Sequence, residues 1–315
     1  MPIAVVAAGF GGPENLELVE RDVREPGPGE ALLAVRAAGV NPIDAKSYSG
    51  AFGNDPSRLP MPLGLEAAGV VRAVGPDAGG PAGPIRVGDE VIAFRISGGY
   101  ADELVVPASA LVPKPPQLAW DAASGLMLAG TTAVHALRVA RAAPGETLLL
   151  HGGSGAVGLA ALQLAVAGGT RVIATASPGH HDLLRELGAE PVAYGPGLAD
   201  RVRALAPEGV VAAVDTVGTD EAVDVSVELV GDLSRVVTIA GFARGAERGI
   251  VRIGGGPGAD PGTAIRDAAR LELASAVAAG RLQVLVAARH PLADAAAAHR
   301  AVLGRHRPGK IALIP

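Results

Sequence analysis

The stretch TLLLHGGSGAVGLAALQLAVAGG, from Thr147 to Gly169, decides the fold. It opens with a short apolar run that ends in a glycine turn, which predicts a buried strand followed by an apolar helix. The glycines have the spacing G-x-G-x-x-G, and strand, glycine turn and helix in this order predict a site for a dinucleotide pyrophosphate. The residues of this site are expected to be Gly153, Ser154, Gly155, Ala156, Val157 and Gly158.

Each glycine of this motif has an expected task. Gly153 allows the tight turn, Gly155 lets the backbone approach the pyrophosphate, and Gly158 lets the helix lie close to the strand. The N-terminus of the helix offers free N–H groups to the anion. The alternative is a plain glycine-rich turn, because the chain contains 44 glycines. The strands that follow in order favour the dinucleotide site.

Composition limits the possible classes of protein. The 315 residues are 49% hydrophobic, which is enough for two domains, each with its own core. The net charge is −5 without a basic run, so neither nucleic acid nor an anionic membrane is an expected partner. The chain has no cysteine, which excludes disulfides and thiolate zinc sites. No apolar run reaches the roughly 18 residues of a membrane helix, and a cytoplasmic location is expected.

The chain changes character near Pro113. Before it, short β-favouring runs between glycine and proline turns predict a compact, mostly antiparallel β domain. After it, a helix is expected over Trp120–Ala140, and then strands and helices alternate, which predicts a parallel sheet. The strands expected in this part are Thr147–His151, Arg171–Thr175, Pro191–Tyr194, Val210–Asp215 and Arg235–Ala240. The chain closes with a helix over Thr263–Ala279, a strand over Gln283–Ala288, a helix over Leu292–Leu303 and a strand over Lys310–Ile314.

The end of the second strand of this sheet indicates which cofactor is bound. An NAD site usually has an acidic residue there for the ribose 2′-hydroxyl. In this chain the strand ends at Ala176 and Ser177, and the next carboxylate is Asp182. Because a serine can donate a hydrogen bond to a 2′-phosphate that an acid would repel, we expect NADP(H), with Ser177 as a phosphate contact.

Several segments resemble the medium-chain dehydrogenases/reductases, in particular the zinc-free quinone oxidoreductases related to zeta-crystallin. The resemblance covers the chain from end to end and in order. It rests on GVNPIDAK (39–46), PLGLEAAGVV (62–71), GDEVIAF (88–94), GGYADELVVPA (98–108), AGTTAVHAL (129–137), HGGSGAVG (151–158), DTVG (215–218) and GKIALIP (309–315).

The resemblance implies an α/β chain of two domains. A GroES-like, mostly β catalytic domain is expected from residues 1–116 and 258–315, and a Rossmann domain with a doubly wound parallel sheet from residues 117–257. The resemblance also implies an active-site cleft between the two domains and a homodimer joined through the Rossmann domain. The implied activity is the transfer of hydride from NADPH to a small quinone or an α,β-unsaturated carbonyl compound.

Two positions depart from the pattern of the zinc alcohol dehydrogenases. Asn41 and Leu65 stand where those enzymes have a cysteine and a histidine, and neither can replace a thiolate or an imidazole as a zinc ligand. The adjacent Glu66 alone is not a metal site, so no metal is expected. Hydride transfer to an electron-poor acceptor does not require a metal, because the cofactor supplies the difficult chemistry.

The resemblance places further residues in the site. Asn41 and Tyr48 are expected to border the nicotinamide and substrate, with Tyr48 as a possible proton donor. The alternatives are that Asn41 begins a turn and that Tyr48 only packs. Thr131 resembles a residue that contacts nicotinamide, although it also suits a helix N-cap. Lys310 is expected near the cofactor, or else is a surface cation.

The 2′-phosphate region also departs from the relatives. Tyr194 is expected to face this phosphate, and His181 lies in a segment where relatives often have lysine or arginine. A neutral histidine adds no full charge, so the preference for NADPH is expected to be modest. The turns after the fourth and fifth strands should also face the dinucleotide, because ligands lie at the carboxyl ends of parallel strands. Their expected contacts are Val217, Gly218, Ala240, Gly241 and Phe242.

These observations favour an NADPH-dependent, zinc-free reductase of quinones or α,β-unsaturated carbonyls. One alternative is an enone or enoyl reductase of a biosynthetic pathway. Another, from a different class, is a dinucleotide-binding protein with vestigial catalysis.

Overall fold

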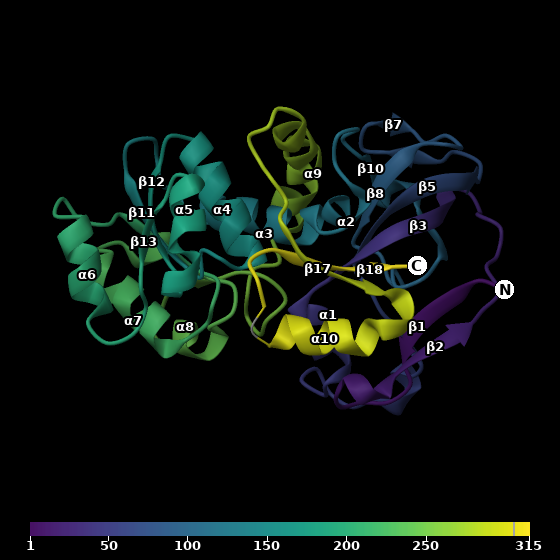
Figure 1. Ribbon diagram of the computed structural model, residues 1–315, viewed down its shortest axis with the longest axis horizontal. Coiled ribbons are helices and arrows are strands. Elements are labelled where there is room, and N and C mark those ends of the chain that lie inside the picture. Colours follow the sequence, from purple (N-terminus) through teal and green to yellow (C-terminus); the bar gives the residue numbers. More distant parts are fainter. Residues whose placement is uncertain (305) are drawn as a thin grey trace. The chain divides into compact units, whose positions relative to one another are not determined.

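The structure, a computed structural model, describes residues 1–304 and 306–315. The chain forms two compact units (Figure 1). Unit 1 comprises residues 1–128, 270–278 and 284–315, and unit 2 comprises residues 129–269 and 279–283. The fold class expected from the sequence, a mostly β unit and a unit with a parallel sheet, is confirmed.

The limits of the units differ from the domain boundaries expected at residues 116 and 257. Residues 117–128 belong to unit 1, and residues 258–269 and 279–283 belong to unit 2. Helix α2 (Trp120–Ala123) packs on strands of unit 1, and the amide of Leu128 donates to Glu66 Oε2 at 2.8 Å. The predicted single helix over Trp120–Ala140 is therefore two helices, α2 and α3 (Leu126–Ala140).

Unit 1 is built on a seven-stranded sheet, mostly antiparallel, in which β3 pairs with three other strands. The burial of β3 alternates along its first half, and its last four residues are all buried, as expected for a central strand. The order is β10 (Leu111–Pro113), β8 (Glu90–Phe94), β5 (Glu66–Val74), β3 (Glu30–Val40), β18 (Lys310–Ile314) and β17 (Val286–Pro291), with β9 (Glu103–Pro107) also on β3.

Smaller elements complete unit 1. A second sheet has the order β2 (Leu16–Glu20), β1 (Ile3–Ala7) and β4 (Met61–Pro62), and β6 (Gly79–Gly80) pairs with β7 (Gly83–Pro84). The helices are α1 (Pro42–Tyr48), α2, α10 (Ala295–Leu303) and the end of α9 (Thr263–Ala278). The strand predicted over Gln283–Ala288 was wrong in its limits, because β17 begins at Val286, where pairing with β18 starts.

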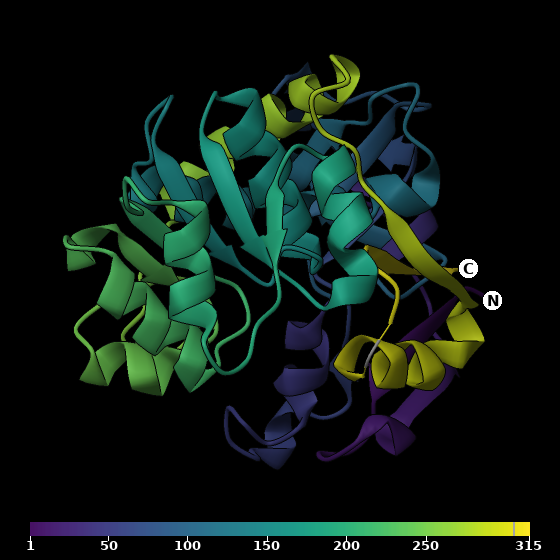
Figure 2. The same ribbon diagram turned by 60° about the vertical axis from the view of Figure 1, so that its left-hand side comes forward.

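Unit 2 is a six-stranded parallel sheet (Figure 2). Its order is β13 (Glu190–Val192), β12 (Arg171–Thr175), β11 (Thr147–His151), β14 (Ala212–Asp215), β15 (Val236–Thr238) and β16 (Val251–Arg252). In order of appearance this is 3-2-1-4-5-6, the doubly wound arrangement of dinucleotide-binding domains. The helices are α4 (Ala156–Ala167), α5 (His181–Glu186), α6 (Leu198–Leu205), α7 (Asp220–Leu229) and α8 (Phe242–Glu247), together with most of α3 and the start of α9.

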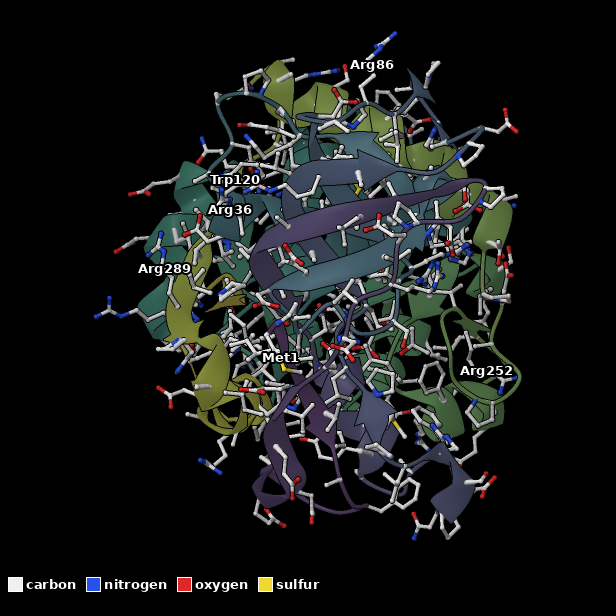
Figure 3. All side chains as sticks on the ribbon, turned by 90° about the vertical axis from the view of Figure 1, so that its right-hand side faces the viewer. Met1, Arg36, Arg86, Trp120, Arg252 and Arg289 are labelled. Atoms are coloured by element: carbon white, nitrogen blue, oxygen red, sulfur yellow. The ribbon has the colours of Figure 1, made fainter. Side chains whose placement is uncertain are left out.

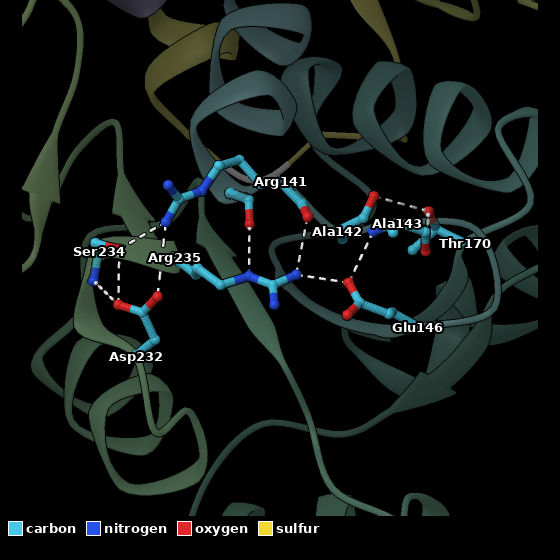
Figure 4. Close-up of polar contacts among 9 residues, drawn as sticks. Arg141, Ala142, Ala143, Glu146, Thr170, Asp232, Ser234 and Arg235 are labelled. Carbon is cyan, nitrogen blue, oxygen red and sulfur yellow. Dashed lines mark hydrogen bonds and ion pairs between the residues drawn. The ribbon is translucent and has the colours of Figure 1, made fainter.

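The side chain of Arg235 connects several segments at the amino-terminal edge of this sheet by hydrogen bonds. Arg235 donates to the carbonyl oxygens of Ala140 and Arg141 at 3.2 and 2.8 Å, and to Glu146 Oε2 at 2.6 Å (Figure 4). The hydrogen bond and charge of Arg235 lower the pKa of Glu146. Arg141, which is more exposed, contacts Ser234 and Asp232. The end of α3 is thereby joined to the start of β11 and β15.

We expect Arg235→Met to lower the melting temperature by roughly 3–6 °C, because it removes three hydrogen bonds from a side chain that is 18% exposed. Arg141→Met is the matched control, and it should shift the melting temperature by about 1 °C or less because Arg141 is 58% exposed. Thermal unfolding followed by circular dichroism measures both. Equal shifts for the two variants would contradict the assignment.

Candidate functional site

The glycine turn of unit 2 follows β11 and leads into α4. The left-handed backbone is at Gly152, with φ +78°, so the tight turn predicted at Gly153 begins one residue earlier. Gly153 is needed for packing instead, since a Cβ there would lie 2.9 Å from Cβ of Ala174. A Cβ at Gly158 would overlap the carbonyl oxygen of Gly152, which confirms the predicted close approach of the helix.

The N-terminus of α4 lacks a side-chain cap. Gly155 is the N-cap residue and makes no capping hydrogen bond, and Ser154, Ala156 and Val157 are half-buried beside it. A Cβ at Gly155 would meet only the carbonyl oxygen of Gly152, at 3.5 Å, so the surroundings of this glycine are open. Backbone N–H groups at an uncapped helix N-terminus next to open space are available to bind an anion.

The turns after β12 and β13 contain the residues predicted for a 2′-phosphate. Ser177 is half-buried, and its Oγ lies 3.2 Å from Nδ1 of His180. His181 points back into its own turn, with Nε2 3.2 Å from the carbonyl oxygen of Ala176. Tyr194 is 55% exposed. Ser177 therefore contacts the imidazole of His180, whereas the imidazole of His181 contacts the carbonyl oxygen of Ala176.

A buried carboxylate organises the turns after β14 and β15, a role that the sequence did not indicate. Asp215 is fully buried and accepts from the amides of Val217 and Gly218 at 2.8 and 2.9 Å. It also accepts from Thr238 Oγ1 at 2.7 Å, and this hydroxyl in turn accepts from the amides of Ala240 and Gly241. One carboxylate thus holds both predicted turns, and Phe242 begins α8 directly after the second.

Two buried side-chain atoms at or next to the predicted site segments of unit 2 have no hydrogen-bond partner among the described residues. One is Oγ1 of Thr131, which is fully buried inside α3 and is therefore not at its N-cap. The other is Nε2 of His151, the last residue of β11, whose pKa burial lowers to about 4. Unpaired buried polar groups are costly, so both atoms are candidates for contact with a ligand.

In unit 1, Asn41, Glu66 and Lys310 form a buried network. The ammonium of Lys310 contacts Oδ1 of Asn41 and lies 2.9 Å from Glu66 Oε1. Asn41 Nδ2 also donates to Glu66 Oε1, at 3.0 Å. The three residues are at most 4% exposed, so Lys310 is not a surface cation. Gly125 leaves room for it, since a Cβ there would lie 2.7 Å from Cγ of Lys310.

Tyr48 lies in the core of unit 1 and is 1% exposed. Its hydroxyl is 2.8 Å from Nδ1 of His299, whose Nε2 is 3.1 Å from the hydroxyl of Tyr100. The hydroxyl of Tyr100 donates to Asp44 Oδ2 at 2.9 Å, and the same oxygen accepts from the backbone N–H of Asn41. This geometry argues against Tyr48 as a proton donor to substrate, because its hydroxyl is directed into a closed chain of side chains.

Burial shifts the pKa values of these hydrogen-bonded side chains in opposite directions. It raises the pKa of Asp44 to about 7, although hydrogen bonds from Asn41 and Tyr100 oppose the shift, and it lowers the pKa of His299 to about 4. It also raises the pKa of Tyr48 to about 12. His299 is therefore a neutral imidazole at neutral pH, and it joins α10 to α1.

Three further observations concern features of other kinds. Among residues 1–304 and 306–315, no group of three or more histidines, aspartates and glutamates is arranged to hold a metal ion. An open pocket of about 740 Å³ in unit 1 is lined by Met1, Arg36 and Trp120, among others (Figure 3). None of the predicted site residues lines this pocket. No helix in the described part of the chain is both long and apolar enough to cross a membrane.

The comparisons with known proteins agree with this architecture. Residues 27–116 match the family described as alcohol dehydrogenase GroES-like domain, and residues 156–254 match the family described as zinc-binding dehydrogenase. The two units thus define a medium-chain dehydrogenase/reductase. The quinone oxidoreductase of Pseudomonas aeruginosa is 33% identical over 98% of both chains. The chain belongs to the quinone oxidoreductase family.

One further relative is matched over part of its length, and two solved structures are matched over nearly the whole chain. The mouse synaptic vesicle membrane protein VAT-1 homolog is 32% identical over 78% of this chain, which spans 61% of the mouse protein. A mycobacterial protein solved with NADPH has a TM-score of 0.85 and 30% identity, with full coverage of both chains. The CurK enoyl reductase has a TM-score of 0.85 and 25% identity over 99% of both chains.

We expect Gly158→Ala to destabilise unit 2 and abolish dinucleotide binding, because the added methyl group overlaps a backbone carbonyl that cannot move aside. Gly155→Ala is the matched control for folding. Its Cβ has room at 3.5 Å, so the melting temperature should hold while dinucleotide affinity falls, because the methyl group enters the anion space. Thermal unfolding with and without NADPH separates the two effects. A stable Gly158→Ala variant with normal binding would contradict the packing argument.

The buried His299 predicts a loss of stability in acid. The pKa of His299 in the folded protein, about 4, lies below the ordinary value of about 6.5. The contribution of the neutral imidazole to the free energy of unfolding is therefore complete above pH 6.5 and is lost as the pH falls toward 4. The loss amounts to about 3 kcal/mol at most. Asp44 acts in the opposite sense, because the stability linked to its raised pKa is complete below pH 4 and lost as the pH rises through 7.

Urea unfolding of the wild type and of His299→Gln between pH 4 and pH 7 isolates the histidine, because both proteins keep Asp44. The advantage of the wild type over the variant should shrink as the pH falls. A constant difference across this range would show that His299 does not carry the effect.

Proposed function

We propose that this protein is an NADPH-dependent oxidoreductase that transfers hydride to a quinone or an α,β-unsaturated carbonyl compound, without zinc. The observation that carries the proposal is the uncapped N-terminus of α4, at the carboxyl edge of a 3-2-1-4-5-6 parallel sheet. Membership of the quinone oxidoreductase family supports the reaction, and the similar mycobacterial protein solved with NADPH supports the cofactor.

The residues of unit 2 fit a bound NADPH. The backbone amides of Ser154, Ala156, Val157 and Gly158 would hold the pyrophosphate, beside Gly155, whose own amide donates to the carbonyl oxygen of Gly152 at 3.1 Å. Ser177 and Tyr194 would face the 2′-phosphate. The turns with Val217 and Gly218 and with Ala240, Gly241 and Phe242 follow strands on the other side of β11. Oγ1 of Thr131 is a buried hydroxyl without a partner in the described chain, as a cofactor contact requires. When bound, NADPH supplies the hydride.

The proposal omits zinc because the side chains do not fit it. Asn41 and Leu65 offer neither a thiolate nor an imidazole. The carboxylate next to Leu65, that of Glu66, already accepts hydrogen bonds from Lys310, Asn41 and the amide of Leu128. An ammonium thus neutralises this carboxylate. A quinone or an activated alkene is already electron-poor and does not need a metal to polarise it.

Asn41 stays in the proposed site, and Lys310 acquires a different role from the one expected. Lys310 donates to Oδ1 of Asn41, which orients the amide so that its Nδ2 donates to Glu66. We therefore assign Lys310 to holding Asn41 and not to a direct contact with the cofactor. Tyr48 is not retained as a catalytic residue, and the proton that completes quinone reduction would come from water.

An enone or enoyl reductase of a biosynthetic pathway is the second candidate, and the similarity to the CurK enoyl reductase favours it. A cytoplasmic location and a homodimer remain part of the proposal. A partner strand could not simply extend the sheet at β16, because Gly254 and Arg252 already pair with Asp260 of the same chain, at 2.8 and 2.9 Å.

The test is oxidation of NADPH and NADH by the purified protein, with a simple benzoquinone and a simple enone as acceptors. We expect faster loss of NADPH than of NADH, and faster loss with the quinone. Dialysis against a chelator should leave the rate unchanged, because no zinc takes part. Turnover with the enone alone would favour the second candidate. Binding of NADPH without turnover on either acceptor would favour a binding protein with vestigial catalysis.

A further inference from the structure

Two turns lie next to each other at the carboxyl edge of the sheet in unit 2. Strands β12 and β13 are parallel neighbours, with Thr175 opposite Val192, and the amide of Ala176 donates to the carbonyl oxygen of Val192 at 3.1 Å. Ser177 lies two residues after Thr175, and Tyr194 lies two residues after Val192. The register therefore brings together the two residues that were predicted to face a 2′-phosphate.

A guanidinium that the sequence did not single out orders the second of these turns. Arg201 of α6 donates to the carbonyl oxygen of Ala193 from Nε and Nη2, at 3.2 and 2.8 Å. It also donates to the carbonyl oxygens of Gly195 and Pro196, at 2.9 and 2.8 Å. These four hydrogen bonds all go to backbone, and they fix the segment that carries Tyr194.

The charge of Arg201 differs from that of its neighbour on the same helix. Arg203 is paired with Asp200 and Glu228, so carboxylates neutralise it. In the described part of the chain, Arg201 contacts carbonyl oxygens and no carboxylate. Glu221 lies at the same turn and accepts from the amide of Gly195 at 3.0 Å, so its charge opposes anion binding. The guanidinium charge offsets that effect.

The first turn contributes a histidine. Nδ1 of His180 is 3.2 Å from Ser177 Oγ, and a Cβ at the adjacent Gly179 would meet nothing within 4 Å, so this turn is open. The other charged groups nearby, Asp182 and Arg185, form a pair on α5. His180 is thus placed to act together with Ser177, whereas His181 is bonded to Ala176.

We propose that Arg201 and His180 make this site selective for a 2′-phosphorylated adenosine. Arg201 is a positioning residue that orders the Tyr194 turn and supplies a fixed positive charge, and His180 supplies a donor beside Ser177. The inference rests on the proposed use of NADPH and names the residues that set the cofactor preference. It also replaces the modest preference expected from histidine alone with a stronger one, because a guanidinium remains charged at all physiological pH values.

The test uses adenosine 2′,5′-bisphosphate and 5′-AMP as probes, with binding to the full-length protein measured by calorimetry. Arg201→Gln should weaken the bisphosphate about tenfold, which corresponds to about 1.4 kcal/mol, and 5′-AMP less than twofold, because the positive charge and the ordered Tyr194 turn act only on the 2′-phosphate. Arg203→Gln is the matched control and should change neither affinity. Arg201→Lys keeps the positive charge but cannot make the four hydrogen bonds of the guanidinium. Its affinity for the bisphosphate should therefore lie between those of the wild type and Arg201→Gln.

His180→Asn should lower the affinity for the bisphosphate alone, by a smaller factor than Arg201→Gln. If Arg201→Gln does not fold, as judged by its thermal transition, Arg201→Lys and Tyr194→Phe take its place. Each should then weaken the bisphosphate more than 5′-AMP.

The remaining outcomes would overturn the inference about Arg201, the choice of NADPH or the cofactor site itself. Equal losses for both probes, or no loss, with Arg201→Gln would overturn the inference while NADPH use stands, provided that the wild type prefers the bisphosphate. A wild type that binds both probes equally would overturn the choice of NADPH and the inference with it. A wild type that binds neither probe would overturn the proposed cofactor site itself.

Discussion

The site of unit 2 depends on one constraint: the parallel strands are paired so that their last residues lie opposite one another. His151 lies opposite Thr175 on one side and Asp215 on the other, Asp215 lies opposite Thr238, and Thr175 lies opposite Val192. The turns that follow these residues therefore leave the sheet at one edge. Because β11 is central and the chain continues first to one side and then to the other, the glycine turn is flanked by turns from both halves of the sheet.

Buried polar groups hold the turns and the side chains in place. In unit 2 the carboxylate of Asp215 and the hydroxyl of Thr238 satisfy four amides in two turns, which replaces solvent as the partner of these groups. In unit 1 the ammonium of Lys310 balances the carboxylate of Glu66 and fixes the amide of Asn41. A buried charge of either sign would be costly alone, so each network depends on all its members.

Much of the fold could be predicted because the signals were local. The strand, glycine and helix order around Gly153 to Gly158 and the alternation after Pro113 follow from periodicity and turn residues over short stretches. The boundaries were less well predicted: α2 belongs to unit 1 through contacts with β3, β5 and β18, which are distant in sequence. The site was predicted only in part, because Tyr48 has the same sequence signal whether its hydroxyl faces substrate or His299.

The sequence by itself determined the class of fold, the position of the glycine turn, and the absence of an acidic residue after Arg171–Thr175. These depend on residue type and spacing along the chain. Only the tertiary structure decided that Lys310 is buried against Glu66, that His180 and not His181 accompanies Ser177, and that Arg201 lies under the Tyr194 turn. Such contacts depend on how side chains from separate elements meet, and burial, which sets the cost of each charge, is a property of the folded chain alone.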